Sequence, residues 1–232
     1  MKRVHCIVEG QTEVRVFSML LAPYIFEKTG ACILFTPIKH TGGGIVKFSK
    51  IFPELRNHLK DKNKIVTTFF DYYGIYPKYE FKYYDEAKVQ QTNAKVGAKL
   101  LEKGMKEYLD EKGVNTRLFI PYIQLHEFEA LLFSSQDGFD FQYDNERILD
   151  DLQKVSHRYP NPEDINDSPK TAPSKRIISI LEKHGEKYVK TSDGEDIATI
   201  IGIDTILEQC PRFRNWVETL VLKINELPDE LI

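Results

Sequence analysis

A strand-to-helix junction lies near the N-terminus, in the segment VHCIVEGQTE (residues 4–13). Its first half is mostly apolar and β-branched, which predicts a buried strand that ends just before Glu9. Gly10 permits a tight turn, and after Thr12, a candidate N-cap, apolar residues recur every three or four positions as in a helix. Glu9 is therefore expected at the carboxyl edge of a strand, where open α/β sheets bind ligands. Glu13 stands one turn into the helix, and two carboxylates there suggest a hard divalent cation such as Mg²⁺.

The composition indicates a globular chain without a strong overall charge. It has 232 residues, 41% of them hydrophobic, enough for one large domain or a core domain with an elaboration. The net charge of −3 gives no general basic field for nucleic acid, although metal ions bound to carboxylates would change the local sign. Cys6, Cys32 and Cys210 form no disulfide or zinc pattern, and the first two are expected as core residues in strands. Without a recognisable signal peptide or membrane span, a cytoplasmic location away from membranes is expected.

Strands and helices alternate through the first half of the chain. Besides the N-terminal pair, strands are predicted at 33–38, 65–70 and 118–125, a turn at 41–44, and helices at 45–59, 96–109 and 128–133. This alternation predicts an α/β fold with a mostly parallel sheet flanked by helices in residues 1–135. Residues 136–232 are predicted to be a mainly helical elaboration packed on that core. An acidic and aromatic loop is predicted at 137–144, and helices at 144–156, 173–184, 197–201, 205–209 and 213–227.

Three acidic residues, Glu9, Asp71 and Glu127, stand directly after predicted strands. Because the carboxyl ends of parallel strands share one edge of a sheet, these side chains are expected to converge. Glu129 joins them if the chain from Glu127 is extended, since alternate residues then share a face. In a helix the two glutamates diverge by about 200°, and only one of them reaches the site. His126 has three interpretations: a metal ligand, an acid or base, or a buried hydrogen-bonded residue.

A candidate phosphate-binding turn occurs in the segment TAPSKR (residues 171–176). Thr171 can cap a helix, and Pro173 suits its first turn. Lys175 and Arg176 would then be cations near a helix N-terminus, where the helix dipole disfavours them unless an anion is bound. A phosphate would supply that anion, and an ordinary solvated pair is the alternative. A second, less specific basic and aromatic group comprises Lys187, Tyr188 and Lys190.

Five distinctive segments extend over almost the whole chain: VEGQTE (8–13), TTFFDYYG (67–74), IPYIQLHEFEALLF (120–133), INDSPKTAPSKRI (165–177) and CPRFRNW (210–216). Together they resemble the bacterial family DUF4276, a domain of unknown function. More broadly, the acidic motifs resemble the Toprim fold, which topoisomerases, primases and nucleases of the overcoming-lysogenization-defect type share. Members of the DUF4276 family are often encoded beside ATPases, in settings that suggest defence against phages.

The resemblance implies metal-dependent phosphodiester chemistry on a Toprim-like fold. Glu9 matches the invariant Toprim glutamate, Glu13 the second acidic residue of the nuclease branch, and Asp71 the first aspartate of the Asp-x-Asp motif. The sequence departs from that motif at Tyr73, which replaces the second aspartate. Lys175 is implied as the cation that is set against the scissile phosphate. The expected substitutes for the missing carboxylate are Glu127 and Glu129.

A nuclease that cleaves DNA or RNA with one or two Mg²⁺ or Mn²⁺ ions is therefore the expected function. The expected metal ligands are Glu9, Glu13, Asp71, Glu127 and Glu129, and the residues expected to contact substrate are Lys175, Arg176 and His126. The expected partners are nucleic acid, an ATPase encoded nearby and a second copy of the chain. Because the second aspartate is missing, a non-catalytic module that binds an ATPase or nucleic acid is an alternative. Another is a nucleotide phosphohydrolase that uses the same site.

Overall fold

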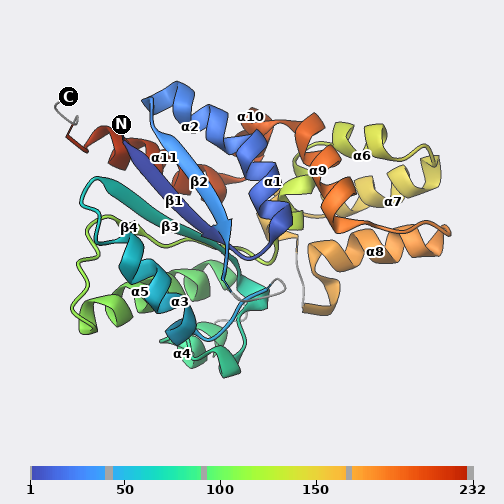
Figure 1. Cartoon of the computed structure of the whole chain (residues 1–232). Helices are drawn as coiled ribbons and strands as arrows, with labels where there is room; N and C mark the ends of the chain where they lie inside the picture. Colours follow the sequence, from blue (N-terminus) through green and yellow to red (C-terminus); the bar gives the residue numbers. More distant parts are fainter. Residues whose placement is uncertain (1, 40–43, 90–92, 166–168, 229–232) are drawn as a thin grey trace.

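A parallel β-sheet forms the centre of the protein, as the computed structural model of residues 2–39, 44–89, 93–165 and 169–228 shows (Figure 1). The strands lie in the order β2-β1-β3-β4, and β5 pairs with the end of β3. Every strand pair is parallel. The predicted α/β class is therefore confirmed, whereas most of the predicted turn at 41–44 lies outside the described residues. The strands are β1 (Arg3–Val8), β2 (Cys32–Pro37), β3 (Lys64–Asp71), β4 (Phe119–Ile120) and β5 (Ile123–Gln124).

Helices cover both faces of the sheet because alternate residues of β1 point to opposite sides. Val4, Cys6 and Val8 belong to one buried cluster, and Ile7 belongs to the other. The first cluster is completed by α1 (Gln11–Met19), α2 (Leu21–Thr29) and α11 (Pro211–Asn225). The second is completed by α3 (Phe48–His58), α4 (Tyr84–Val89) and α5 (Ala94–Glu111), which lie below the sheet in Figure 1.

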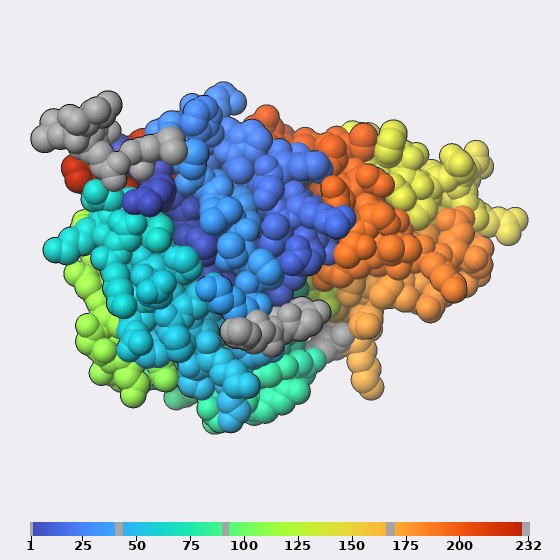
Figure 2. All heavy atoms as spheres, in the orientation of Figure 1, coloured from blue at the N-terminus to red at the C-terminus, as the bar shows by residue number. Residues whose placement is uncertain are grey.

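The C-terminal half is mainly helical, as predicted, and it enlarges the first cluster. In Figure 2 its yellow and orange helices project beside the blue N-terminal helices. Val16 of α1 shares a buried cluster with Phe139 and Ile197, so one apolar core crosses the predicted boundary at residue 135, which stays a prediction. No helix in the described part of the chain is both long and apolar enough to cross a membrane. The elements are the 3-10 helix η3 (Phe128–Ser134), α6 (Asp137–Gln142), α7 (Glu146–Ser156), α8 (Pro173–Lys183), α9 (Lys190–Ile201) and α10 (Ile203–Gln209).

Polar contacts hold α11 against the sheet. Glu163 is fully buried, and its two carboxylate oxygens accept the N–H groups of Arg212 (2.7 Å) and Phe213 (3.1 Å). These N–H groups belong to the first turn of α11, which has no partners for them within the helix. Trp216 is buried and donates from Nε1 to Thr67 Oγ1 over 2.9 Å.

Helix α6 replaces the loop predicted at 137–144, and that prediction was wrong. The segment DGFDFQ has weak helix propensity, because it contains glycine and two aspartates. Tertiary packing compensates: Phe139 is fully buried, and a Cβ at Gly138 would lie 2.8 Å from Ile197 of α9. The glycine therefore allows the two helices to approach closely, which the local pattern does not reveal.

Three smaller predictions also differ from the structure. Gly10, not Thr12, is the N-cap of α1. Cys32 is exposed on the edge strand β2 and is not a core residue. Helix α9 begins at Lys190 instead of 197, and the Asp193 carboxylate holds its start by accepting the Val189 N–H over 2.9 Å. Residues 190–196, the first part of α9, contain no apolar side chains, so the sequence shows no helical spacing of apolar residues there.

Candidate metal centre

The carboxyl edge of the sheet brings Glu9 and Asp71 together. Val8, the last residue of β1, pairs with Phe69, and β3 continues to Asp71, so Glu9 and Asp71 both lie at the carboxyl ends of neighbouring strands. The backbone N–H of Asp71 donates to Oε1 of Glu9 over 2.8 Å. The shared edge expected from parallel strands thus places these two residues in direct contact.

Burial makes both of these carboxylates difficult to ionise. It is the main cause that raises the pKa of Glu9 to about 8, and the charges of Glu13 and Glu127 add to the effect. Burial also raises the pKa of Asp71 well above its usual range, and Glu9 is the next cause. Oδ1 of Asp71 is buried and accepts no hydrogen bond from any residue that the structure describes. A nearby cation would favour the charged forms of both groups.

Lys190, the first residue of α9, provides positive charge at this site. Its Nζ is 3.1 Å from an oxygen of the fully buried Glu129 and 3.9 Å from Glu13. Burial alone would lower the pKa of Lys190. The negative charges of Glu129, Asp71 and Glu13 raise it by a larger amount, so the pKa lies above its ordinary value and the lysine stays protonated. The side chain as a whole is 45% exposed, so part of it faces solvent.

The segment after β5 brings both Glu127 and Glu129 to the site. Glu127 has extended backbone and caps η3, whose narrow 3-10 turn then places Glu129 in the interior. The charge of Glu127 contributes to the raised pKa of Glu9, and that of Glu129 to the raised pKa of Asp71. The chain therefore combines the two alternatives, with Glu127 extended and Glu129 in a 3-10 helix, and metal binding by either glutamate stays a prediction.

Two glycines leave room for the carboxylates. A Cβ at Gly74 would lie 3.0 Å from Oε1 of Glu9, and a Cβ at Gly10 would lie 3.2 Å from Oε2 of Glu13. Either added side chain would press on an acidic side chain of the site, because packed interiors have little spare volume. Gly74 thus contributes to the site through the space it leaves, which sequence reasoning did not find.

The donor set fits a hard divalent cation. Carboxylate oxygens are the ligands that Mg²⁺ and Mn²⁺ prefer. A bound cation would give Oδ1 of Asp71 a partner and would reduce the repulsion between the carboxylates. Glu127 is already anchored, because its Oε2 accepts the Ser174 N–H at the start of α8 over 3.0 Å. By donor type the candidate ligands are Glu9, Glu13, Asp71, Glu127 and Glu129. Among the described residues no three of these carboxylates bring one oxygen each within 4.8 Å of the others, so side chains must move for three of them to share one ion.

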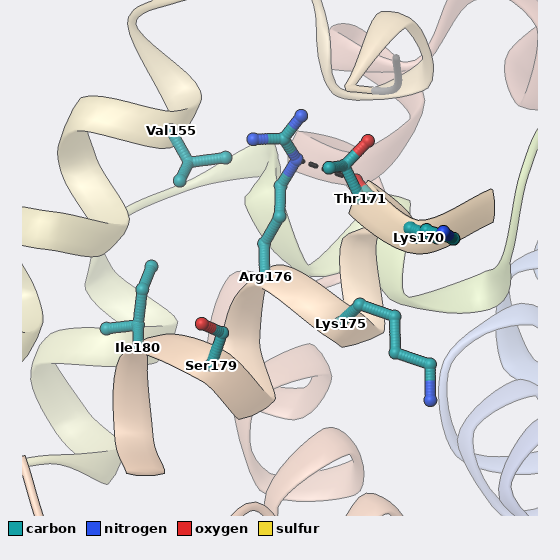
Figure 3. A pocket seen from close by; sticks show the side chains of 7 residues that line it. All are labelled: Val155, Lys170, Thr171, Lys175, Arg176, Ser179 and Ile180. Carbon is teal, nitrogen blue, oxygen red and sulfur yellow. Dashed lines mark hydrogen bonds between the residues drawn. The ribbon is translucent and has the colours of Figure 1, made fainter. Parts of the chain in front are cut away.

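Lys175 and Arg176 line a pocket of about 290 Å³ beside the start of α8 (Figure 3). Arg176 donates from Nε to the carbonyl oxygen of Thr171 over 2.8 Å and from Nη2 to the hydroxyl of Tyr159 over 2.6 Å. Lys175 points away from Arg176 in Figure 3. Ala172, not Thr171, is the N-cap of α8. Lys175 follows Ser174, whose N–H meets Glu127, so the start of α8 adjoins the carboxylates.

His126 is buried beside Tyr73. Its φ of 68° is unusual for a residue with a side chain, and its carbonyl oxygen accepts the Tyr73 N–H over 3.3 Å. Burial lowers the pKa of His126 to about 4, against a smaller upward shift from a hydrogen bond with the Glu163 backbone. Nδ1 has no hydrogen-bond partner among the described residues. Of the three interpretations, the structure supports a buried, neutral histidine, and contact with substrate stays a prediction.

Lys190 is the residue of this site that sequence reasoning ranked too low. The helix dipole disfavours a cation in the first turn of α9, as it does at Lys175, so an anionic partner is needed. Here Glu129 and Glu13 are those partners. The sequence does not show that Lys190 begins a helix, because the spacing of apolar residues predicts this helix only from residue 197.

The parallel sheet and its acidic edge define the class: an α/β protein with a candidate metal centre where its central strands end. Residues 8–221 match the family described as "Domain of unknown function (DUF4276)", and the chain belongs to that family. The family expected from the five sequence segments is thereby confirmed. No curated protein matches the chain. A solved structure, the C-terminal region of the Xanthomonas campestris pv. campestris OLD protein, is similar with a TM-score of 0.43 and 15% identity, covering 97% of this chain and 96% of that one.

Proposed function

We propose that the protein is a metal-dependent nuclease that hydrolyses phosphodiester bonds in DNA or RNA. The observation that carries the proposal is Asp71: it is buried with a free Oδ1, is hydrogen bonded to Glu9, and lies among further carboxylates around Lys190. So many buried acidic groups at one edge are costly unless a cation is bound there. The resemblance of the acidic motifs to Toprim nucleases agrees with this chemistry, and it extends the proposal to an ATPase partner in defence against phages.

The carboxylates and Lys190 have different roles in the proposal. Glu9, Glu13, Asp71 and Glu127 would hold one or two Mg²⁺ or Mn²⁺ ions. Such an ion supplies Lewis acidity that polarises the phosphate and lowers the pKa of an attacking water.

Glu129 is paired with Lys190, so its first role is to hold the ammonium in place. The ammonium group of Lys190 would then stabilise negative charge that develops on the phosphoryl oxygens.

Incubation of the pure protein with mixed DNA and RNA, with and without Mn²⁺, tests this function. We expect cleavage only with the metal, and none by an Asp71→Asn variant that is purified in parallel to exclude a contaminating nuclease. Addition of an ATPase encoded nearby extends the same assay. If the wild-type protein binds nucleic acid but leaves it intact in every arm, the nuclease proposal is wrong. Tyr73 at the second aspartate position would then favour the non-catalytic binding module.

Lys175 and Arg176 are expected to respond differently to replacement by alanine. A phosphate near the start of α8 would be met by the Lys175 ammonium, so Lys175→Ala should slow cleavage by about ten- to a hundredfold. Arg176→Ala should instead lower the stability by about 1 kcal/mol, because it loses its bonds to Thr171 and Tyr159. Cleavage rate, Mn²⁺ calorimetry and thermal melting separate the two effects. A Lys175→Ala protein with the wild-type rate would remove Lys175 from the site.

A further inference from the structure

A second polar group lies between β1 and α3, away from the carboxyl edge of the sheet. The imidazole of His5 stacks on that of His58 from α3, with ring centroids 3.7 Å apart. Glu54 stands one helical turn before His58, and its Oε1 is 3.9 Å from His58 Nε2. One ligand atom from each of the three side chains lies within 4.8 Å of the others.

Glu54 is the unexplained member of this group. Its side chain is only 7% exposed, and Oε1 is buried and accepts no hydrogen bond from any described residue. Nζ of Lys39, at 3.8 Å, is too distant to donate one. A buried carboxylate oxygen without a donor costs free energy, which a bound cation would offset.

His5 has the second contact that holds a ligating imidazole in place. Nε2 of His5 is hydrogen bonded to Thr36 Oγ1 over 2.9 Å, which leaves its other ring nitrogen for a ligand. Metal-binding histidines are held in this way by an oxygen on the far side of the ring. His58 differs, because its Nδ1 faces the donating Lys64 ammonium at 3.4 Å. That ammonium must withdraw before Nδ1 can carry the ring proton and Nε2, on the side of Glu54, can bind an ion. One ring must turn out of the stack so that both lone pairs meet a single ion.

We propose that His5, Glu54 and His58 form a site for a transition-metal ion of the Zn²⁺ class, separate from the carboxylate centre. Two imidazole nitrogens and one carboxylate oxygen suit Zn²⁺ and leave a fourth position open, whereas Mg²⁺ prefers oxygen ligands alone. A pocket of about 330 Å³ beside Glu54 and His58 provides the path for entry. Because the ligands come from β1 and α3, the ion would fasten this helix to the sheet.

Two lysines beside the group oppose a cation and set its affinity. Lys39 lies 3.8 Å from Glu54, and Lys64 lies 3.4 Å from His58. The ion therefore competes with both ammonium groups. Lys39 is 65% exposed, so its removal should strengthen binding without disturbing the fold.

Calorimetry with Zn²⁺ on the full chain, in excess Mg²⁺ to occupy the carboxylate centre, tests the proposal. His58→Gln and Glu54→Gln should each weaken Zn²⁺ binding about tenfold or more, because each removes a ligand. Lys39→Gln should strengthen it severalfold. His157→Gln, which removes an exposed imidazole after α7, should bind as the wild type does. Zn²⁺ should raise the melting temperature of the wild type and of His157→Gln, but not of His58→Gln.

Two results would overturn the proposal: a wild-type protein that binds no Zn²⁺, or equal binding by the wild type, Glu54→Gln and His58→Gln. Melting without metal shows whether each variant is folded. Glu54→Gln is the decisive variant, because a neutral amide relieves the unpaired carboxylate and should keep the fold intact. Glu9→Gln should leave Zn²⁺ binding unchanged, so failure of this site is distinguishable from failure of the nuclease proposal.

Discussion

Replacement of Glu9 by glutamine is expected to reduce metal-dependent cleavage roughly a thousandfold. The carboxylate of Glu9 is one of the oxygens that would hold the ion, and it also fixes the Asp71 backbone through their hydrogen bond. The amide can still accept that bond, so the geometry is retained while the negative charge is lost. Mn²⁺ binding, measured by calorimetry, should weaken in parallel with the cleavage rate.

The same variant should be more stable than the wild type when metal is absent. The pKa of Glu9 is raised from an ordinary value of 4.5 to about 8, so the folded state retains its proton where the unfolded state has lost it. The stability of the wild type therefore falls as the pH rises through that window. Because glutamine has no proton to lose, Glu9→Gln should be more stable than the wild type at about pH 8 by roughly 2 kcal/mol.

Urea denaturation in the presence of a chelator, at about pH 5 and pH 8, measures this difference. Asp71 has a raised pKa of the same sign and remains in the variant, so some pH dependence should persist. Glu182→Gln, on the exposed surface of α8, is the matched control and should follow the wild type. Parallel pH curves for the wild type and Glu9→Gln would show that Glu9 ionises normally and does not share a repulsive site.

The Lys190→Met variant should lose both cleavage and stability. Methionine fills a similar volume but leaves the buried Glu129, together with Glu13 and Asp71, without the ammonium that compensates them. Removal of one partner of a fully buried pair costs about 3–5 kcal/mol, and we expect about 2 kcal/mol here because Lys190 is partly exposed. Cleavage should fall roughly a hundredfold or more, because a charge directed at the phosphate is lost.

Mn²⁺ should restore part of the lost stability of Lys190→Met, since the ion replaces some of the missing positive charge. It should restore little of the cleavage rate. Lys187→Met is the control, because Lys187 is an exposed lysine shortly before Lys190 in the chain. If Lys190→Met were as stable and as active as Lys187→Met, the carboxylates would need no cation from α9.

Much of the centre of the fold can be predicted from local pattern. The apolar runs that become β1 and β3 are bounded by polar residues, and their alternation with helices requires parallel pairing. Parallel strands end at one edge, so Glu9 and Asp71 are expected at the same edge of the sheet. Their direct contact also requires that β1 and β3 be neighbours, which the strand order provides. The acidic residues after β5 reach the same edge for the same reason.

Only the tertiary structure decided the features that join segments distant in sequence. Lys190 reaches Glu129 because α9 packs on α1 and η3, and α6 is helical because Gly138 allows it to pack on α9. The stack of His5 on His58 also depends on how α3 crosses β1. The sequence by itself determined where the strands end and that acidic residues follow them at one edge of the sheet. Strand ends depend on the hydrophobic pattern, and the common edge depends on the direction of the chain in parallel strands. Burial and charge compensation depend on which surfaces meet, and no local pattern records that.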